Sequence, residues 1–170
     1  MAEGWFPENI DAILWMIRDH ATVITFIAVA VFIILKDMQA LRYAGLCAVF
    51  YVVGYCLFDL IIEIDDKKYI FRYIVWTLND ILFMAILAYW AIKDKVYIWQ
   101  SVIAQLVILP APLLQLFRLI DRHLLDLTYS EYLYRTILPL VNITIVLLCF
   151  APLVMLFKKN TQVKKHSLSQ

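Results

Sequence analysis

The chain has 170 residues, of which 64% are hydrophobic and 17% are charged, and its mean hydropathy is +0.80. Soluble domains have about 45–50% apolar and about 25% charged residues, so the composition excludes an ordinary soluble domain and indicates a membrane protein. The net charge of +1 comes from short charged strips between long apolar runs, and no strip is basic enough to predict nucleic-acid binding. The length allows one compact unit, so we expect a single domain over residues 1–158.

The N-terminal segment predicts a helix that leads into the first apolar run. Apolar residues recur at helical spacing between residues 10 and 17, with Trp5 and Trp15 nearby. This pattern is typical of an amphipathic helix that lies in the membrane interface. One long helix over residues 9–35 fits the pattern equally well, and the sequence leaves both interpretations open.

Five apolar runs, separated by charged strips, follow one another along the chain. A helix needs about 20 residues to cross a hydrocarbon core of about 30 Å. Four runs have this length as they stand, and the first has it only when extended. Lipid-exposed backbone must bond within its own segment, and the alternating segments of a β-barrel are absent. The predicted fold is therefore an all-α polytopic transmembrane bundle of five spans. The spans are expected at about residues 17–38, 41–62, 69–92, 96–120 and 132–157.

The charged strips give an expected orientation. With five spans, the 36–42 loop, the 93–95 loop and the basic tail share one face, which carries eight Lys or Arg residues against seven on the other face. Because Lys and Arg favour the cytoplasmic side, we expect a cytoplasmic C-terminus and an external N-terminus in a cell membrane, the inner membrane if the source is bacterial. The tail, residues 159–170, is expected to contact lipid headgroups or to recruit a cytosolic protein.

Asp80 is the strongest functional candidate. It lies near the centre of the apolar run Tyr69–Ile92, and no Lys or Arg is expected at the same depth. Ionisable groups inside transmembrane segments are costly and mark functional sites by default. Either Asp80 is protonated and donates a hydrogen bond, or it is ionised and balanced by a cation or by water in a cavity. Neutral polar residues expected near this depth complete a candidate intramembrane polar site: Asn79, Thr77, Gln105 and Asn142.

Two prolines interrupt the fourth span. Pro110 and Pro112 cannot donate backbone hydrogen bonds, so the carbonyls of Leu106 and Ile108 lose their usual partners. Transporters use such breaks to coordinate ions near mid-membrane, although a simple kink is the favoured interpretation here. Pro110 is expected at about the depth of Asp80.

The second and third spans should form an antiparallel hairpin with an ion pair at its outer end. Asp59 and Glu63 are four residues apart and share one side of the second helix, and Arg72 begins the third. An Asp59–Arg72 or Glu63–Arg72 pair in the outer leaflet is expected mainly to fix the helix register.

The remaining polar residues predict no catalysis. Cys47 and Cys56 fall on opposite sides of one helix, Cys149 lies in another, and no Cys-x-x-Cys or paired-His motif occurs. Residues 118–126 are expected to form an exposed loop. We therefore expect no enzymatic activity, no metal and no cofactor.

Two functions follow from these observations. The first is a homo-oligomeric conduit for a cation, a proton or a small solute, with Asp80 at its centre. The second is a non-catalytic sensor or anchor in the bilayer that recruits a cytosolic partner, a kind of subunit found in bacterial stress and phage-defence modules.

Overall fold

Every regular element described in the structure is a helix. The computed structural model describes the backbone of residues 8–64, 70–125 and 128–167, and the side chains of residues 20–58, 60–61, 63–64, 70–124 and 130–156. The elements are α1 (Glu8–Leu35), α2 (Met38–Ile64), α3 (Ile70–Ile92), α4 (Ile98–Ile108), α5 (Pro110–Ile120), the π-helix η1 (Asp121–Leu125) and α6 (Thr128–Ser167).

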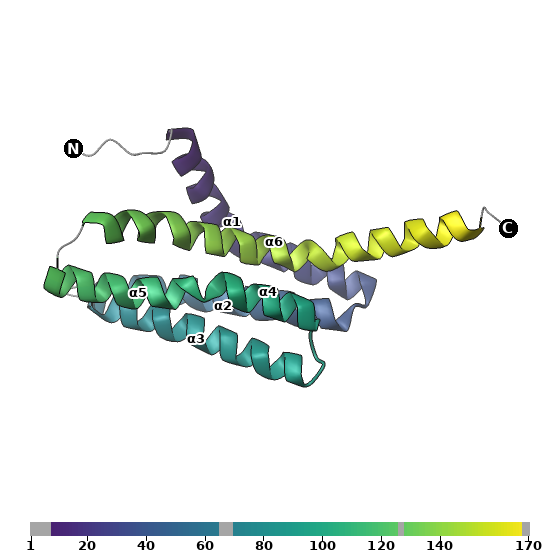
Figure 1. Cartoon of the computed structure of the whole chain (residues 1–170), viewed down its shortest axis with the longest axis horizontal. Helices are drawn as coiled ribbons and strands as arrows, with labels where there is room; N and C mark the ends of the chain where they lie inside the picture. The colour runs from purple at the N-terminus through teal and green to yellow at the C-terminus, as the bar shows by residue number, and fades with distance from the viewer. Residues whose placement is uncertain (1–7, 65–69, 126–127, 168–170) are drawn as a thin grey trace.

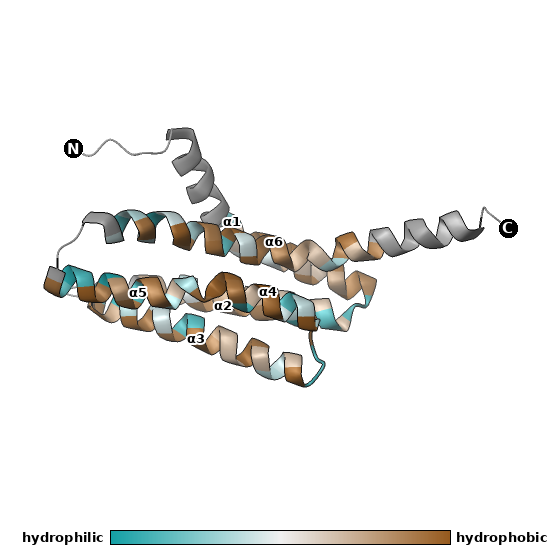
Figure 2. Cartoon of the chain, viewed as in Figure 1, coloured by the Kyte–Doolittle hydropathy of each residue, from teal (hydrophilic) through white to brown (hydrophobic). Residues whose placement is uncertain are grey.

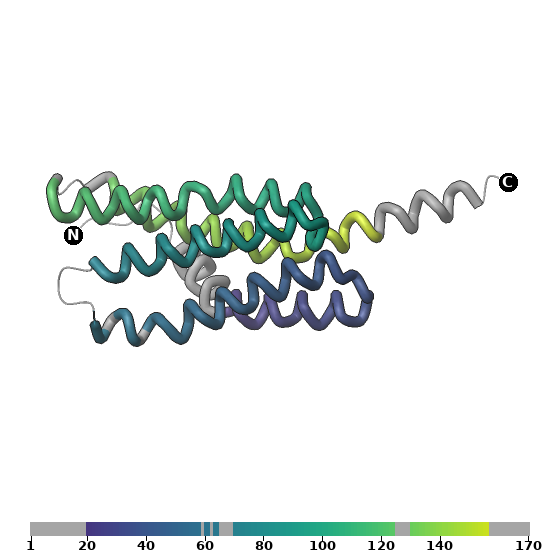
Figure 3. Tube along the Cα trace, turned by 90° about the horizontal axis from the view of Figure 1, so that it is seen from below, coloured from purple at the N-terminus to yellow at the C-terminus, as the bar shows by residue number. Residues whose placement is uncertain are grey.

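The helices lie side by side in an antiparallel bundle (Figure 1). In chain order, α1 contacts α2, α2 contacts α3, α3 contacts α4 and α5, and these two contact α6. α6 also contacts α1, which closes a ring, and α2 contacts α6 across it. The perpendicular view shows the same side-by-side arrangement along the length of the bundle (Figure 3).

Four segments are long and apolar enough to cross a membrane: Met38–Phe58, Ile70–Ile92, Ile98–Leu124 and Ser130–Leu156. A fifth apolar segment, His20–Leu35, is shorter. Hydrophobic residues cover much of every helix along the bundle (Figure 2). The structure thus confirms the predicted helical membrane bundle, in which the first helix contributes the shortest apolar segment.

α1 is one helix from Glu8 to Leu35, as the single-helix alternative predicts. The side chains before His20 lie outside the described residues, so the interfacial location of that part stays a prediction. α6 continues to Ser167 and includes most of the basic tail. The side chains after Leu156 also lie outside the described residues, and recruitment of a partner by the tail stays a prediction.

α1 and α3 end in the same way. Lys36 and Asp94 have left-handed backbones, with φ of 56° and 52°. The Asp37 amide donates to the Phe32 carbonyl at 3.2 Å, and the Lys95 amide donates to the Trp90 carbonyl at 2.8 Å. These are Schellman endings, which satisfy the last carbonyls of a helix and reverse the chain within a few residues.

The two loops that follow these endings are joined by side chains. Asp37 caps α2, because its Oδ1 accepts a hydrogen bond from the Ala40 amide at 3.1 Å. Its Oδ2 accepts a hydrogen bond from the Tyr97 hydroxyl at 2.9 Å. Gln39 Nε2 donates to the Asp94 carbonyl at 3.0 Å, and Arg42 donates to the Lys95 carbonyl at 3.2 Å. We call Asp37, Gln39, Arg42 and Tyr97 the loop clasp. It holds the α1–α2 hairpin against the α3–α4 hairpin at one end of the bundle.

A buried amide compensates for a proline in α6. Pro152 has no N–H, so it cannot bond the Leu148 carbonyl four residues earlier. Gln100 of α4 is fully buried, and its Nε2 donates to that carbonyl at 2.9 Å. The interhelical bond therefore gives a partner to a backbone group that would otherwise lack one in an apolar environment.

Candidate intramembrane polar site

Asp80 lies on α3 with its carboxyl directed into the bundle. Its Oδ2 accepts a hydrogen bond from Nε2 of Gln115, on α5, at 2.9 Å. Gln115 is 2% exposed, and Asp80 is half-buried. Within the described part of the chain, no Lys or Arg forms an ion pair with Asp80. The hydrogen-bond partner of the carboxyl is therefore a neutral amide.

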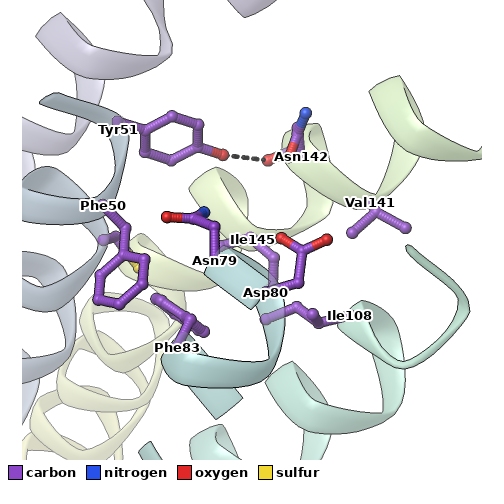
Figure 4. Close-up of a pocket in the computed structure, with 10 residues that line it drawn as sticks. Phe50, Tyr51, Asn79, Asp80, Phe83, Ile108, Val141, Asn142 and Ile145 are labelled. Carbon is purple, nitrogen blue, oxygen red and sulfur yellow. Dashed lines mark hydrogen bonds between the residues drawn. The ribbon is translucent and has the colours of Figure 1, made fainter. Parts of the chain in front are cut away.

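A cavity of about 70 Å³ borders Asp80. Asn79 and Asp80 of α3 lie next to each other on its wall, and Tyr51 of α2 and Asn142 of α6 face them (Figure 4). The Tyr51 hydroxyl donates to the backbone carbonyl of Asn142 at 3.1 Å. One water needs about 10–15 Å³ of such volume and two to four polar partners, so this cavity is large and polar enough to hold water. The apolar part of the wall consists of Cys47, Phe50, Phe83, Ile108, Val141 and Ile145.

The predicted polar residues divide into two groups. Asp80, Asn79 and Asn142 meet at the cavity. Thr77 is buried, but it is not part of the cavity wall, and its hydroxyl has no hydrogen-bond partner among the described residues. Gln105 donates to the Ser101 hydroxyl at 3.0 Å on its own helix, and Ser101 in turn bonds the Leu87 carbonyl.

Gln115 is the functional candidate that the sequence analysis missed. Both Gln105 and Gln115 occur in the same apolar run, and only the helix face separates them. The sequence held no signal that separates them: Gln115 is buried on the same face of α5 as Pro112, and this burial appears only in the folded chain.

The proline pair changes the helix little. α4 ends at Ile108 and α5 begins at Pro110, and Leu109 between them keeps a helical backbone, with φ −47° and ψ −39°. The Leu109 amide bonds the Gln105 carbonyl at 2.9 Å. Pro110 occupies the first position of α5, where a missing N–H is best tolerated. α4 and α5 continue in one direction (Figure 1).

The predicted ion pair at the α2–α3 hairpin cannot be placed in full. Glu63 is exposed and Arg72 is half-buried. The side chain of Asp59 lies outside the described residues, so its pairing with Arg72 stays a prediction.

The interpretation of residues 118–126 as an exposed loop is wrong for its first part. Arg118 lies 3.1 Å from Asp121 and 3.1 Å from Glu131, and the Asp121 side chain is fully buried. Ser130 bonds both Arg118 and Asp121, and Arg135 pairs with Glu131. α5 continues directly into η1, and the contacts with Ser130 and Glu131 of α6 leave the Asp121 side chain without exposure to solvent. We call these five residues the polar cap.

Comparison with protein family models, with curated proteins and with solved structures finds no match to this chain. Its function is therefore inferred from the geometry of its own residues.

Proposed function

We propose that this chain is a membrane protein that passes a proton or a small cation across the bilayer, with Asp80 as the binding group. The observation that carries the proposal is a carboxyl in the middle of a span, next to a polar cavity and bonded to a neutral amide. A structural ion pair would fix such a carboxyl in one charge state. A neutral partner does not balance the charge of the carboxylate, so a proton or a cation that binds reversibly can do so.

The surroundings of Asp80 suit a transient charge. A carboxylate in a low-dielectric interior is strongly destabilised unless a cation, water or a proton compensates its charge. Asn79, Asn142 and Tyr51 line the same cavity as Asp80, so its wall offers a bound water polar groups in addition to the carboxyl.

The proposal includes self-association. Five helices leave few side chains to line a pathway within one chain, so a pathway shared between copies is expected. Native mass spectrometry of the detergent-solubilised protein tests this part, and a monomer at all protein concentrations would contradict it.

Ion flux into proteoliposomes tests the role of Asp80. Asp80→Asn keeps the size of the side chain and its ability to bond Gln115 but removes the titratable charge, so flux should fall about tenfold or more. Thr144→Val is the matched control, because Thr144 lies on α6, is exposed, and bonds only its own helix through the Leu140 carbonyl. Unchanged flux in a folded Asp80→Asn protein would refute the proposal.

A further inference from the structure

We infer that the species bound at Asp80 is a proton and not a metal cation. This inference rests on the proposed function and specifies its substrate. Three features of the site carry it: the donor set around the carboxyl, the two-sided chemistry of Gln115, and the polar cavity.

The donor set does not suit a metal ion. Hard cations bind through about six or more oxygen ligands. At Asp80, an N–H group of Gln115 points at Oδ2 from 2.9 Å, so a positive hydrogen already occupies one of the lone pairs of the carboxylate. The described residues also hold no group of three or more His, Cys, Asp or Glu side chains that could bind a metal.

Gln115 can bond Asp80 in either protonation state. An amide carries both a donor and an acceptor, and its two ends exchange places by a half-turn. The Nε2 group donates a hydrogen bond to the ionised carboxylate. The Oε1 atom is buried and has no hydrogen-bond partner among the described residues, so it is available to accept from a protonated carboxyl. Asp80 can then gain or lose a proton without losing its hydrogen bond.

The cavity supplies the other reactant. A hydronium ion in the cavity transfers one proton to a carboxylate oxygen of Asp80: an O–H bond forms on the carboxyl, an O–H bond of hydronium breaks, and a neutral water is left. The reverse step returns the proton. Asn79 and Asn142 line the same cavity, so the water has polar neighbours besides the carboxyl.

Proton flux measured without alkali metals tests the inference. Proteoliposomes carry a pH-sensitive dye, and N-methylglucamine replaces Na⁺ and K⁺ on both sides. We expect an unchanged rate of proton flux, a fall of about tenfold or more in Asp80→Asn, and a smaller fall in Gln115→Leu, which has neither donor nor acceptor. Thr144→Val should behave like the wild type.

The outcomes separate the two proposals. Flux that requires Na⁺ or K⁺ and is lost in Asp80→Asn would overturn the proton assignment and leave the proposed function standing. Flux that is absent for every ion, or that Asp80→Asn leaves unchanged, would overturn both.

Infrared difference spectroscopy of the wild-type protein provides a measurement that needs no variant. The carbonyl band of a protonated carboxyl should grow as the pH falls, with the same midpoint in Na⁺, K⁺ and N-methylglucamine buffers. A midpoint that moves to lower pH when Na⁺ or K⁺ is added would show that a metal competes for the site, and would contradict the inference.

Discussion

Asp80 and Thr77 lie one turn apart on α3, yet their polar atoms have different surroundings. The carboxyl accepts from Gln115 and borders a cavity, whereas the Thr77 hydroxyl is buried among atoms that offer it no hydrogen bond in the described structure. A buried polar group without a partner costs about 1–3 kcal/mol of stability. Thr77 therefore belongs to the packing of the bundle and not to the site.

Replacing Thr77 by Val should stabilise the protein. The change removes the unpartnered hydroxyl and nearly preserves the shape, so the free energy of unfolding should rise by up to about 1 kcal/mol. Thermal unfolding in detergent measures the effect, and ion flux should not change. The control is again Thr144→Val, which removes a hydroxyl that has a hydrogen-bond partner, the Leu140 carbonyl, on an exposed side chain. A loss of stability in Thr77→Val would mean that the hydroxyl has a partner, such as a buried water.

Tyr97 should make the loop clasp sensitive to high pH. Burial, together with its hydrogen bond to Asp37, raises the pKa of Tyr97 from the usual 10.0 to about 12. The folded state thus favours the neutral phenol, and this contribution to stability is present below about pH 10 and is lost as the pH rises through about 12. The difference in Tm between the wild type and Tyr97→Phe should accordingly shrink over that interval.

The comparison needs a control for general effects of alkali. Tyr132→Phe changes an exposed tyrosine of α6 outside the clasp, so its Tm difference from the wild type measures the general effect of alkali to be subtracted. If the Tyr97→Phe difference stays constant after that subtraction, the phenol does not titrate in the clasp.

At the scale of helices, a residue of α4 provides the hydrogen bond that a proline of α6 cannot make. Gln100 donates to the Leu148 carbonyl, which Pro152 leaves without its helical partner. The amide of Gln100 also has a cost, because its own Oε1 is buried without a partner among the described residues. A polar residue at this position is therefore explained by the proline on the neighbouring helix and not by any ligand.

A double-mutant cycle tests this dependence. Gln100→Leu leaves the carbonyl unpartnered and should cost about 1–3 kcal/mol of unfolding free energy. In a Pro152→Ala background, the restored N–H bonds the same carbonyl, so the cost of Gln100→Leu should fall by about 1 kcal/mol. Unfolding of the four proteins in detergent gives the coupling. Strict additivity would show that Gln100 and Pro152 act independently.

The hairpin of α3 and α4 shows what sequence could and could not predict. Helix lengths were predictable, because the thickness of the bilayer fixes them. Asp80 lies 12 residues before the end of α3, and Pro110 lies 12 residues after the start of α4. In an antiparallel hairpin these equal spacings place the two residues at a similar depth. Gln105 and Gln115 are each five residues from Pro110, about 7.5 Å along the helix, so depth alone could not choose between them. Packing decides: Gln115 is on the buried face beside α3, and Gln105 is only half-buried.

The polar cap was unpredictable for a related reason. Charged residues between two apolar runs usually form a solvated loop, and the sequence around Arg118 carries no signal of burial. Because α5 continues into η1, Asp121 lies next to the start of α6. Its carboxylate accepts hydrogen bonds from Ser130 of α6 and from Arg118 of α5. The partners come from two helices, and this contact between them appears only in the folded chain.

For the whole molecule, the number of membrane crossings depends on whether α1 spans the bilayer. Four other segments have membrane-spanning length, and α1 decides whether the chain crosses four or five times. Its apolar part, His20–Leu35, is about 24 Å long, shorter than a hydrocarbon core of about 30 Å, and the first turns of α1 lie at a steep angle to the bundle (Figure 1). Ala21, Ala28 and Phe32 are buried, and α1 packs against both α2 and α6. A helix held between two spanning helices shares their membrane depth, and the bilayer can thin locally to match a short apolar segment.

We therefore predict five crossings, with the two ends of the chain on opposite sides of the membrane. Alkaline phosphatase is active only outside the cytoplasm, and green fluorescent protein exported in unfolded form fluoresces only inside. With the orientation expected from the Lys and Arg distribution, phosphatase fused at the N-terminus should be active and the fluorescent protein fused at the C-terminus should be bright. A fluorescent fusion inserted after Lys95, in the loop that the clasp joins to the α1–α2 turn, should match the C-terminal result. If both ends report the same side while the Lys95 fusion still agrees with the C-terminus, α1 does not cross, and the bundle has four spans with a helix docked against them.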